Sequence, residues 1–188
     1  MLAVLVLVSY QTQAEVRLPS VFSSNMVLQQ NKEVAIWGWA NPGEQIKITG
    51  SWNNKTVDVK TSSGAKWMTL LQTPIAGGPY VVTIEGENTI ILENVLIGEV
   101  WVCSGQSNME SSATHSYSFN NAKEATSNAN YPKIRLFQVE NATSHPKQAA
   151  LTGTWTLCSP ATMKGVSGTS YFFAREFQYK LYIPIVFI

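Results

Sequence analysis

The sequence predicts a mixed β and α/β fold, with an antiparallel β-sandwich over residues 15–96 followed by α/β structure over residues 97–188. Short segments that alternate apolar and polar residues, separated by turn residues, predict the sandwich. Almost wholly apolar runs joined by a helical pattern predict the α/β part, because parallel strands are buried on both faces. A chain of 188 residues with 45% apolar content is long enough to form both cores.

Three segments of the first part show the alternation of a half-buried strand. In each segment apolar side chains occupy every second position: Ile46 and Ile48; Val57 and Val59; Tyr80, Val82 and Ile84. Turn-forming runs lie around these segments: Asn41-Pro42-Gly43-Glu44, Ser62-Ser63-Gly64, Gly77-Gly78-Pro79 and Gly86-Glu87-Asn88. This spacing of strands and turns favours antiparallel pairing.

The second part contains three apolar runs that we expect to be buried strands of a parallel sheet: Val100 to Cys103, Ile134 to Val139 and Ile183 to Ile188. The last run, IPIVFI, ends the sequence without a cap or a polar tail. We therefore expect the sequence to stop partway through its second domain.

A helix is predicted between the last two of these strands. Its apolar face contains Val166, Thr169, Phe173, Phe177 and Leu181, and its polar face largely contains Arg175, Glu176, Gln178 and Lys180. The spacing of Glu176 and Lys180 predicts a weak ion pair. A helix that leads into a buried strand is typical of the crossover connection in an α/β sheet.

The first fourteen residues are predicted to be a signal peptide. The apolar run MLAVLVLV, Met1 to Val8, is too short to span a bilayer, and Thr12-Gln13-Ala14 offers a site for cleavage after Ala14. No Lys or Arg precedes the run, and an N-terminal strand is the alternative. A signal peptide implies a secreted or periplasmic protein with no membrane span after processing. Export also permits disulfides, but for Cys103 and Cys158 the sequence leaves both a bridge and two buried free thiols open.

The charge pattern argues against several classes of partner. The net charge is +1, only 13% of the residues are charged, and no basic cluster points to nucleic acid or an anionic membrane. No cluster of His, Cys, Asp and Glu has metal-ligand spacing and no phosphate loop follows a strand, so no cofactor is implied. Nothing indicates the oligomeric state. Four tryptophans of the first part are expected in its core, although stacked indoles can also bind sugar rings: Trp37, Trp39, Trp52 and Trp67.

The run VWVCSGQSNME, which begins at Val100, places small and amide residues directly after an apolar strand. A serine hydroxyl becomes a nucleophile when it lies beside a base and when backbone N–H groups face the developing oxyanion. Gly105 permits a sharp turn, and the following amides open a helix. Ser107 is then presented at the edge of the sheet where α/β folds bind ligands. An ordinary polar surface turn is the alternative.

The slightly longer run EVWVCSGQSNME, Glu99 to Glu110, resembles the nucleophile block of the sialate O-acetylesterase family, which is part of the SGNH (GDSL-like) hydrolases. Upstream, RLPSVFSSNMVLQQ and VAIWGWANPGEQIKI resemble the sandwich that precedes the catalytic domain in bacterial members. Downstream, WTLCSP and YFFAREFQYKLYIPIVFI resemble the first crossover helix and the strand after it. The resemblance implies that residues 97–188 form the N-terminal part of an SGNH-type α/β/α domain, which is incomplete in this chain.

The resemblance also implies roles for individual residues. Ser107 is the acyl-accepting nucleophile, and its backbone N–H contributes to the oxyanion hole. Gly105 and Asn108 shape the turn, and Gln106 stands where many relatives have Asp. The side chains of Gln106 and Asn108 either contact the substrate or only hydrogen-bond the loop.

The sequence departs from the family at the catalytic base. The family's Asp-x-x-His pattern, which supplies the base and the residue that orients it, is absent, as are the Gly and Asn of the later oxyanion blocks. Neither His115 nor His145 has Asp three positions earlier, because Ser112 and Ala142 stand there. Both histidines lie in polar stretches typical of solvated surface. We therefore expect these 188 residues alone to lack esterase activity.

The family resemblance implies a serine carboxylic-ester hydrolase that removes O-acetyl groups from carbohydrates through an acyl-enzyme. O-acetylated sialic acid is the first expected substrate, and acetylated plant polysaccharide is the alternative. A non-catalytic carbohydrate-binding module built on the sandwich is the alternative from a different class of protein.

Overall fold

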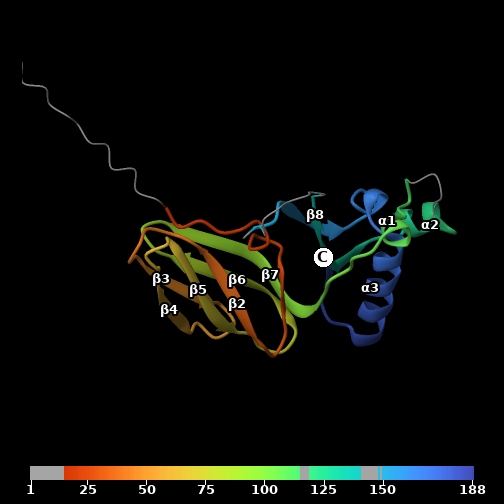
Figure 1. Cartoon of the computed structure of the whole chain (residues 1–188). Helices are drawn as coiled ribbons and strands as arrows, with labels where there is room; N and C mark the ends of the chain where they lie inside the picture. Colours follow the sequence, from red (N-terminus) through yellow and green to blue (C-terminus); the bar gives the residue numbers. More distant parts are fainter. Residues whose placement is uncertain (1–14, 115–118, 141–147, 149) are drawn as a thin grey trace, which may run out of the picture.

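The structure is a computed structural model that describes residues 15–114, 119–140, 148 and 150–188 (Figure 1). The predicted signal peptide, His115 and His145 all lie outside the described residues. Within the described part of the chain, no helix combines the length and the apolar character needed to cross a bilayer.

The first half of the chain builds two sets of strands whose pairing is antiparallel as predicted, except that β1 runs parallel to β7. The strands are β1 (Val27–Gln29), β2 (Glu33–Trp39), β3 (Gln45–Gly50), β4 (Thr56–Lys60), β5 (Lys66–Gln72), β6 (Gly77–Glu85) and β7 (Thr89–Trp101). Strand β3 pairs with β4 and β6, and β6 pairs with β7, whereas β2 and β5 form a separate two-stranded sheet. The alternation predicted for β3, β4 and β6 is confirmed, because their apolar side chains are the more buried ones at every second position.

The two sheets enclose an apolar core. Ile46 and Ile48 of β3 are fully buried, and Ile36 of β2 and Trp67 of β5 pack in the same cluster. The expectation of a core position is confirmed for Trp67, whereas Trp37, Trp39 and Trp52 are only half-buried. This half therefore follows the rule that each strand buries one face.

Strand β7 belongs to both halves of the molecule. Up to Ile97 it pairs antiparallel with β6, and from Glu99 to Trp101 it pairs parallel with β10. The predicted boundary after Leu96 falls inside this continuous strand. Gly98 lies at the changeover, where a Cβ atom would collide with the carbonyl oxygen of Pro184.

The second half forms a parallel sheet with one antiparallel edge. Its elements are α1 (Ser107–Glu110), α2 (Ala122–Ser127), β8 (Tyr131–Val139), β9 (Gly153–Cys158), a 3-10 turn (Met163–Gly165), α3 (Gly168–Leu181) and β10 (Ile185–Phe187). Strand β10 lies between β7 and β8 and is parallel to both, which confirms the parallel pairing predicted from the apolar runs. Strand β9, which the sequence did not predict, pairs antiparallel with β8.

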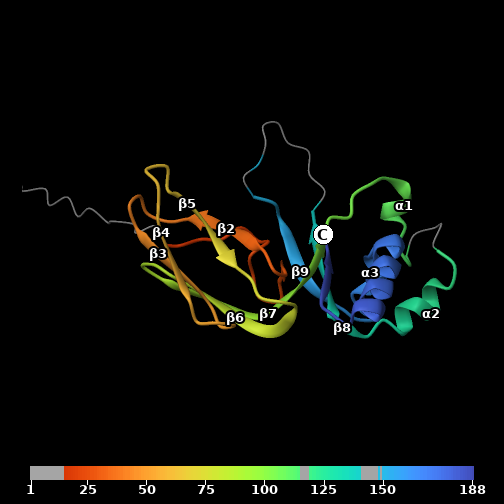
Figure 2. The same cartoon turned by 90° about the horizontal axis from the view of Figure 1, so that it is seen from below.

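Helix α3 packs along this sheet (Figure 2), and of the predicted apolar face Val166, just before the helix, and Phe177 pack against the core there, but other residues are buried more deeply. Tyr171 and Ala174 are buried at 1% and 0% exposure, whereas Leu181 is 46% exposed. The predicted aromatic face has another partner, because Phe173 and Phe177 contact the Trp101 ring edge-on at centroid distances of 5.1 and 5.4 Å. Apolar periodicity identified the helix but did not show which of its residues face the sheet and which contact Trp101.

A buried arginine connects the two halves. Arg135 of β8 is 3% exposed, and its Nη2 donates to Asn94 Oδ1 at 3.3 Å. Asn94 Nδ2 in turn donates to Asn25 Oδ1 at 2.7 Å. No partner is recorded for Nε and Nη1 of Arg135 within the described residues, and burial lowers the pKa of this guanidinium from its ordinary value.

Candidate active site

The candidate site lies at the edge of the sheet where the parallel strands end. Phe187 of β10 is in register with Trp101 of β7 and with Leu136 of β8, so the three strands leave the sheet at a common edge. In parallel α/β sheets the segments after the carboxyl ends of the strands carry the ligand-binding groups. Ser107 follows β7 at this edge.

The connection from β7 to α1 extends the strand and then turns sharply. Ile188 N–H donates to the Trp101 carbonyl at 2.9 Å, and Cys103 N–H donates to the Ile188 carbonyl at 2.7 Å, so pairing continues beyond β7. The Gln106 carbonyl then accepts from the Met109 N–H at 2.8 Å, which closes the turn. A Cβ atom at Gly105 would lie 2.6 Å from Met109 Cγ, so a larger residue here would have to displace the Met109 side chain.

Ser107 is the first residue of α1, and its side chain is exposed. Within the described residues no hydrogen bond of the Ser107 hydroxyl is recorded. The first N–H groups of a helix have no partner within it, and no hydrogen bond of the Ser107 and Asn108 N–H groups is recorded among the described residues. The arrangement offers a free hydroxyl with main-chain donors beside it.

Helix α1 is fixed against the start of α3. Thr169 Oγ1 donates to the Asn108 carbonyl at 3.2 Å, and Gly168 N–H donates to the Ser111 carbonyl at 2.8 Å. The side chains of Gln106 and Asn108 are exposed. Both residues hold the turn through their main-chain carbonyls, whereas their side-chain amide groups face solvent.

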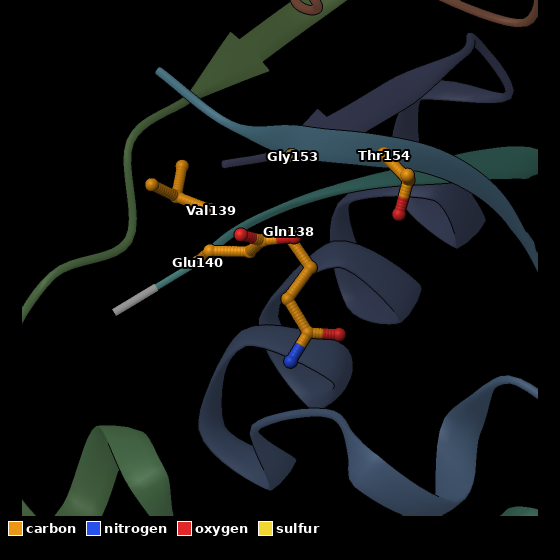
Figure 3. Close-up of a pocket in the computed structure, with 5 residues that line it drawn as sticks. All are labelled: Gln138, Val139, Glu140, Gly153 and Thr154. Carbon is orange, nitrogen blue, oxygen red and sulfur yellow. The ribbon is translucent and has the colours of Figure 1, made fainter. Parts of the chain in front are cut away.

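A hollow of about 270 Å³ lies at the same edge of the sheet, on the far side of β10 (Figure 3). Its lining comes from the facing ends of β8 and β9: Gln138, Val139, Glu140, Gly153 and Thr154. Neighbouring strands are about 4.8 Å apart, so β8 lies about 10 Å from β7 across the intervening β10. The sequence did not predict a site at these residues, although Gln138 and Glu140 lie at the end of an apolar run, and Ser107 also follows one.

The described residues bring no catalytic base to Ser107. The only Asp of the sequence, Asp58, lies in β4 of the other half, and His115 and His145 lie outside the described residues. No group of three or more His, Cys, Asp and Glu side chains gathers at a metal-binding distance in the part that the structure describes. Neither a histidine nor the Asp is therefore placed beside Ser107 in the part of the chain that the structure describes.

The two cysteines are not bridged. Cys103 is half-buried and Cys158 is buried, and both thiols are free. Burial raises the pKa of the Cys158 thiol to about 11, opposed by a hydrogen bond with the Tyr131 backbone. At neutral pH this thiol is protonated and therefore not nucleophilic.

The fold and the site together define a class of protein. A strand-rich half joined through one strand to a parallel sheet is the fold of a carbohydrate esterase: the structure matches a carbohydrate acetylesterase from Xanthomonas citri with a TM-score of 0.85 and 31% identity, over 92% of this chain and 39% of that one. No protein-family model matches the chain.

Sequence relatives narrow the class to a family. The chain is 37% identical to the sialate O-acetylesterase of Mus musculus over 133 residues, which are 65% of this chain and 24% of that protein. It is 34% identical to the sialate O-acetylesterase of Rattus norvegicus over 147 residues, which are 73% of this chain and 27% of that protein. The chain belongs to the sialate O-acetylesterase family. It spans about a quarter of the length of these curated relatives.

Proposed function

We propose that Ser107 is the nucleophile of a carbohydrate O-acetyl esterase. The observation that carries this proposal is the exposed Ser107 hydroxyl at the first position of α1, beyond the carboxyl end of β7. The unpaired first N–H groups of α1 are suited to bind an oxyanion. Membership of the sialate O-acetylesterase family supports the same chemistry.

The proposed reaction has two steps. The Ser107 Oγ attacks the acetyl carbonyl carbon and its proton passes to a base. The tetrahedral intermediate then expels the sugar oxygen, which takes up that proton, and acetyl-Ser107 remains. A water molecule that gives its proton to the same base attacks the acetyl group, and acetate leaves as Ser107 regains its proton.

The base of this reaction is proposed to lie outside these 188 residues. Asp58 is remote in β4, and the residue three positions after it is Thr61 rather than His. An activated serine without its base retains only the small acceleration that binding and oxyanion contacts supply. The chain by itself is therefore expected to be inactive.

We infer acetylated sialic acid as the substrate, because the curated relatives are named sialate O-acetylesterases. The second candidate, another acetylated carbohydrate such as plant polysaccharide, is favoured by the structural match to a carbohydrate acetylesterase. Acetate release from O-acetylated sialic acid and from acetylated xylan, measured side by side, distinguishes the two.

Two measurements test the nucleophile and the base separately. In a longer protein that contains this chain and an Asp-x-x-His segment, a fluorophosphonate probe should modify Ser107, and Ser107→Ala should lower acetate release at least about a thousandfold. Modification of another serine, or activity retained by Ser107→Ala, contradicts the nucleophile. Steady hydrolysis of p-nitrophenyl acetate by the 188-residue chain, abolished by Ser107→Ala, contradicts the external base.

We also propose that the protein is exported and processed after Ala14, since Met1 to Val8 has the composition of a signal peptide core. N-terminal sequencing of the secreted or periplasmic product should then begin at Glu15. A product that retains Met1 contradicts export by this route.

A further inference from the structure

The face of the β2–β5 sheet turned away from Ile36 is only partly covered, and it carries two half-buried tryptophans, of which Trp37 still packs at the margin of the core. Ile36 and Gly38 of β2 point into the core, so Trp37 and Trp39 lie on the opposite, outer face. Trp37 is in register with Met68 of β5. Met68 is 65% exposed, which places this pair at the surface.

A hollow of about 260 Å³ opens on this face. It is lined by Trp37, Gly38, Trp39, Lys66, Trp67 and Met68. Ligand pockets for drug-sized molecules start at about 300 Å³, so this hollow suits a single small ring. Two indoles beside a ring-sized space favour a ligand with flat, C–H-rich faces, such as a pyranose.

Two cations flank the second indole. Lys66 is in register with Trp39 on one side, and Arg17 forms an antiparallel bridge with Trp39 on the other. The bridge has two hydrogen bonds, from Arg17 N–H to the Trp39 carbonyl at 2.8 Å and from Trp39 N–H to the Arg17 carbonyl at 2.9 Å. Residues paired directly across antiparallel strands place their side chains on the same face. Arg17, Trp39 and Lys66 therefore form one row across β2, β5 and the bridged segment at Arg17.

The charges of this row are not neutralised. Arg17 and Lys66 are exposed, and no ion pair of either is recorded among the residues that the structure describes. An anionic group above Trp39 would meet a cation on each side. With a net charge of +1 over the whole sequence, a ligand with one carboxylate fits better than a polyanion.

The first indole is held in place before any ligand arrives. Phe22, which is buried, contacts the Trp37 ring edge-on at a centroid distance of 4.5 Å. A side chain that is already ordered loses little conformational entropy on binding. The Trp37 ring is thus held in one orientation at the hollow, opposite Trp39 and its two cations.

We propose that this face binds a carboxylated pyranose, with the sugar ring against Trp39 and the carboxylate between Arg17 and Lys66. The site lies on the β2–β5 sheet, at the end of the molecule away from α1 and α3 (Figures 1 and 2). It is therefore separate from Ser107 and serves to hold an acidic glycan rather than to cleave it. The proposal goes beyond the esterase activity and does not depend on it.

Amide chemical shifts of the ¹⁵N-labelled chain provide the test, with glucuronic acid and N-acetylneuraminic acid as acidic probes and glucose as the neutral one. The acidic sugars should shift the amides of residues 37–39 and 66–68 with a Kd on the order of 1 mM. Glucose should bind at least about fivefold more weakly, since it lacks the carboxylate. Shifts confined to other residues, or equal affinity for glucose, overturn the proposal.

Variants separate the roles of the indole and the cations. The double substitution Arg17→Gln and Lys66→Gln changes only exposed side chains and should weaken the acidic sugars about fivefold while leaving glucose unchanged. Trp39→Ala should weaken all three sugars. Lys47→Gln, an exposed lysine on β3, is the matched control and should change nothing. Wild-type affinity in the double variant overturns the proposal. Because this chain is expected to have no turnover, failure here leaves the Ser107 proposal untouched.

Discussion

The two halves of the molecule bury their apolar side chains in different patterns. In the first half, β2 and β5 face the larger sheet, and the apolar side chains between them alternate with exposed ones along each strand. In the second half, β10 and residues 134–137 of β8 are buried continuously, because α3 covers one face and the segment around Asn25 and Asn94 covers part of the other. Alternation therefore accompanies strands with one buried face, whereas continuous burial accompanies strands that are covered on both faces.

A substitution at Gly98 is expected to have the largest effect on stability, because Gly98 lies where β7 passes from one half to the other. Gly98→Ala would drive a methyl group into the Pro184 carbonyl and separate β10 from β7. We expect a loss of at least about 3 kcal/mol of unfolding free energy, with amide protection lost first in β10 and β8.

Gly165→Ala is the control for that substitution, since a Cβ atom at Gly165 would meet nothing within 4 Å. It should change stability by less than about 0.5 kcal/mol. Equal effects of the two substitutions in urea unfolding would show that the contact between Gly98 and Pro184 is unimportant.

The core of the first half can be weakened separately. Ile48→Ala removes a fully buried side chain between the two sheets and should cost about 2–5 kcal/mol. Ile91→Ala on β7, where the side chain is 57% exposed, should cost under about 0.5 kcal/mol. Denaturant midpoints measure both, and a small loss for Ile48→Ala would argue against a shared core of the two sheets.

The two thiols probe the burial of the second half. Cys158 has a raised pKa of about 11, so it should react with iodoacetamide at pH 8.5 far more slowly than Cys103 does. Because the unfolded thiol ionises near its ordinary pKa while the folded one stays protonated, the stability from this group is complete below the unfolded value and falls as the pH rises toward 11. Equal alkylation rates, measured by peptide mass spectrometry, would contradict a closed core beneath α3.

The smallest expected effect concerns the outer surface of α3. Glu176 and Lys180 form the predicted ion pair at 3.2 Å, and both side chains are mostly exposed. Glu176→Gln should therefore lower stability by only about 0.3–0.5 kcal/mol, and added salt should remove the difference. A thermal shift of the variant that persists in 1 M salt would mean that the residue does more than pair with Lys180.

Local patterns predicted much of the fold. Period-two alternation identified β3, β4 and β6, and apolar runs identified β8 and β10 with their parallel direction. Strand β9 was missed although GTWTLC alternates threonines with two large apolar residues; its pairing with β8 is a long-range contact that no local pattern specifies. The predicted buried face of α3 was only partly right, because apolarity alone does not show that Phe173 turns toward Trp101 while Tyr171 is buried against the sheet.

The candidate site could be predicted only where its residues lie close together in the sequence. The glycine turn and Ser107 follow β7 within a few residues, so a short motif was enough to find them. The hollow beside β10 and the row of Arg17, Trp39 and Lys66 depend on strand register, which no local pattern specifies. The buried Arg135 was missed for the same reason, because its partner Asn94 comes from the other half.

The continuity of β7 restricts how this architecture can be divided. A cut after Leu96 would remove from β10 the only stretch of β7 that it pairs with in the described structure, Glu99–Trp101. The sandwich could be transplanted to another protein only together with that stretch, and a flexible spacer inserted there would disconnect one half from the other. Insertions belong instead in the exposed turn at Ser63 and Gly64, where a Cβ atom at Gly64 would meet only Ser62 Oγ within 4 Å.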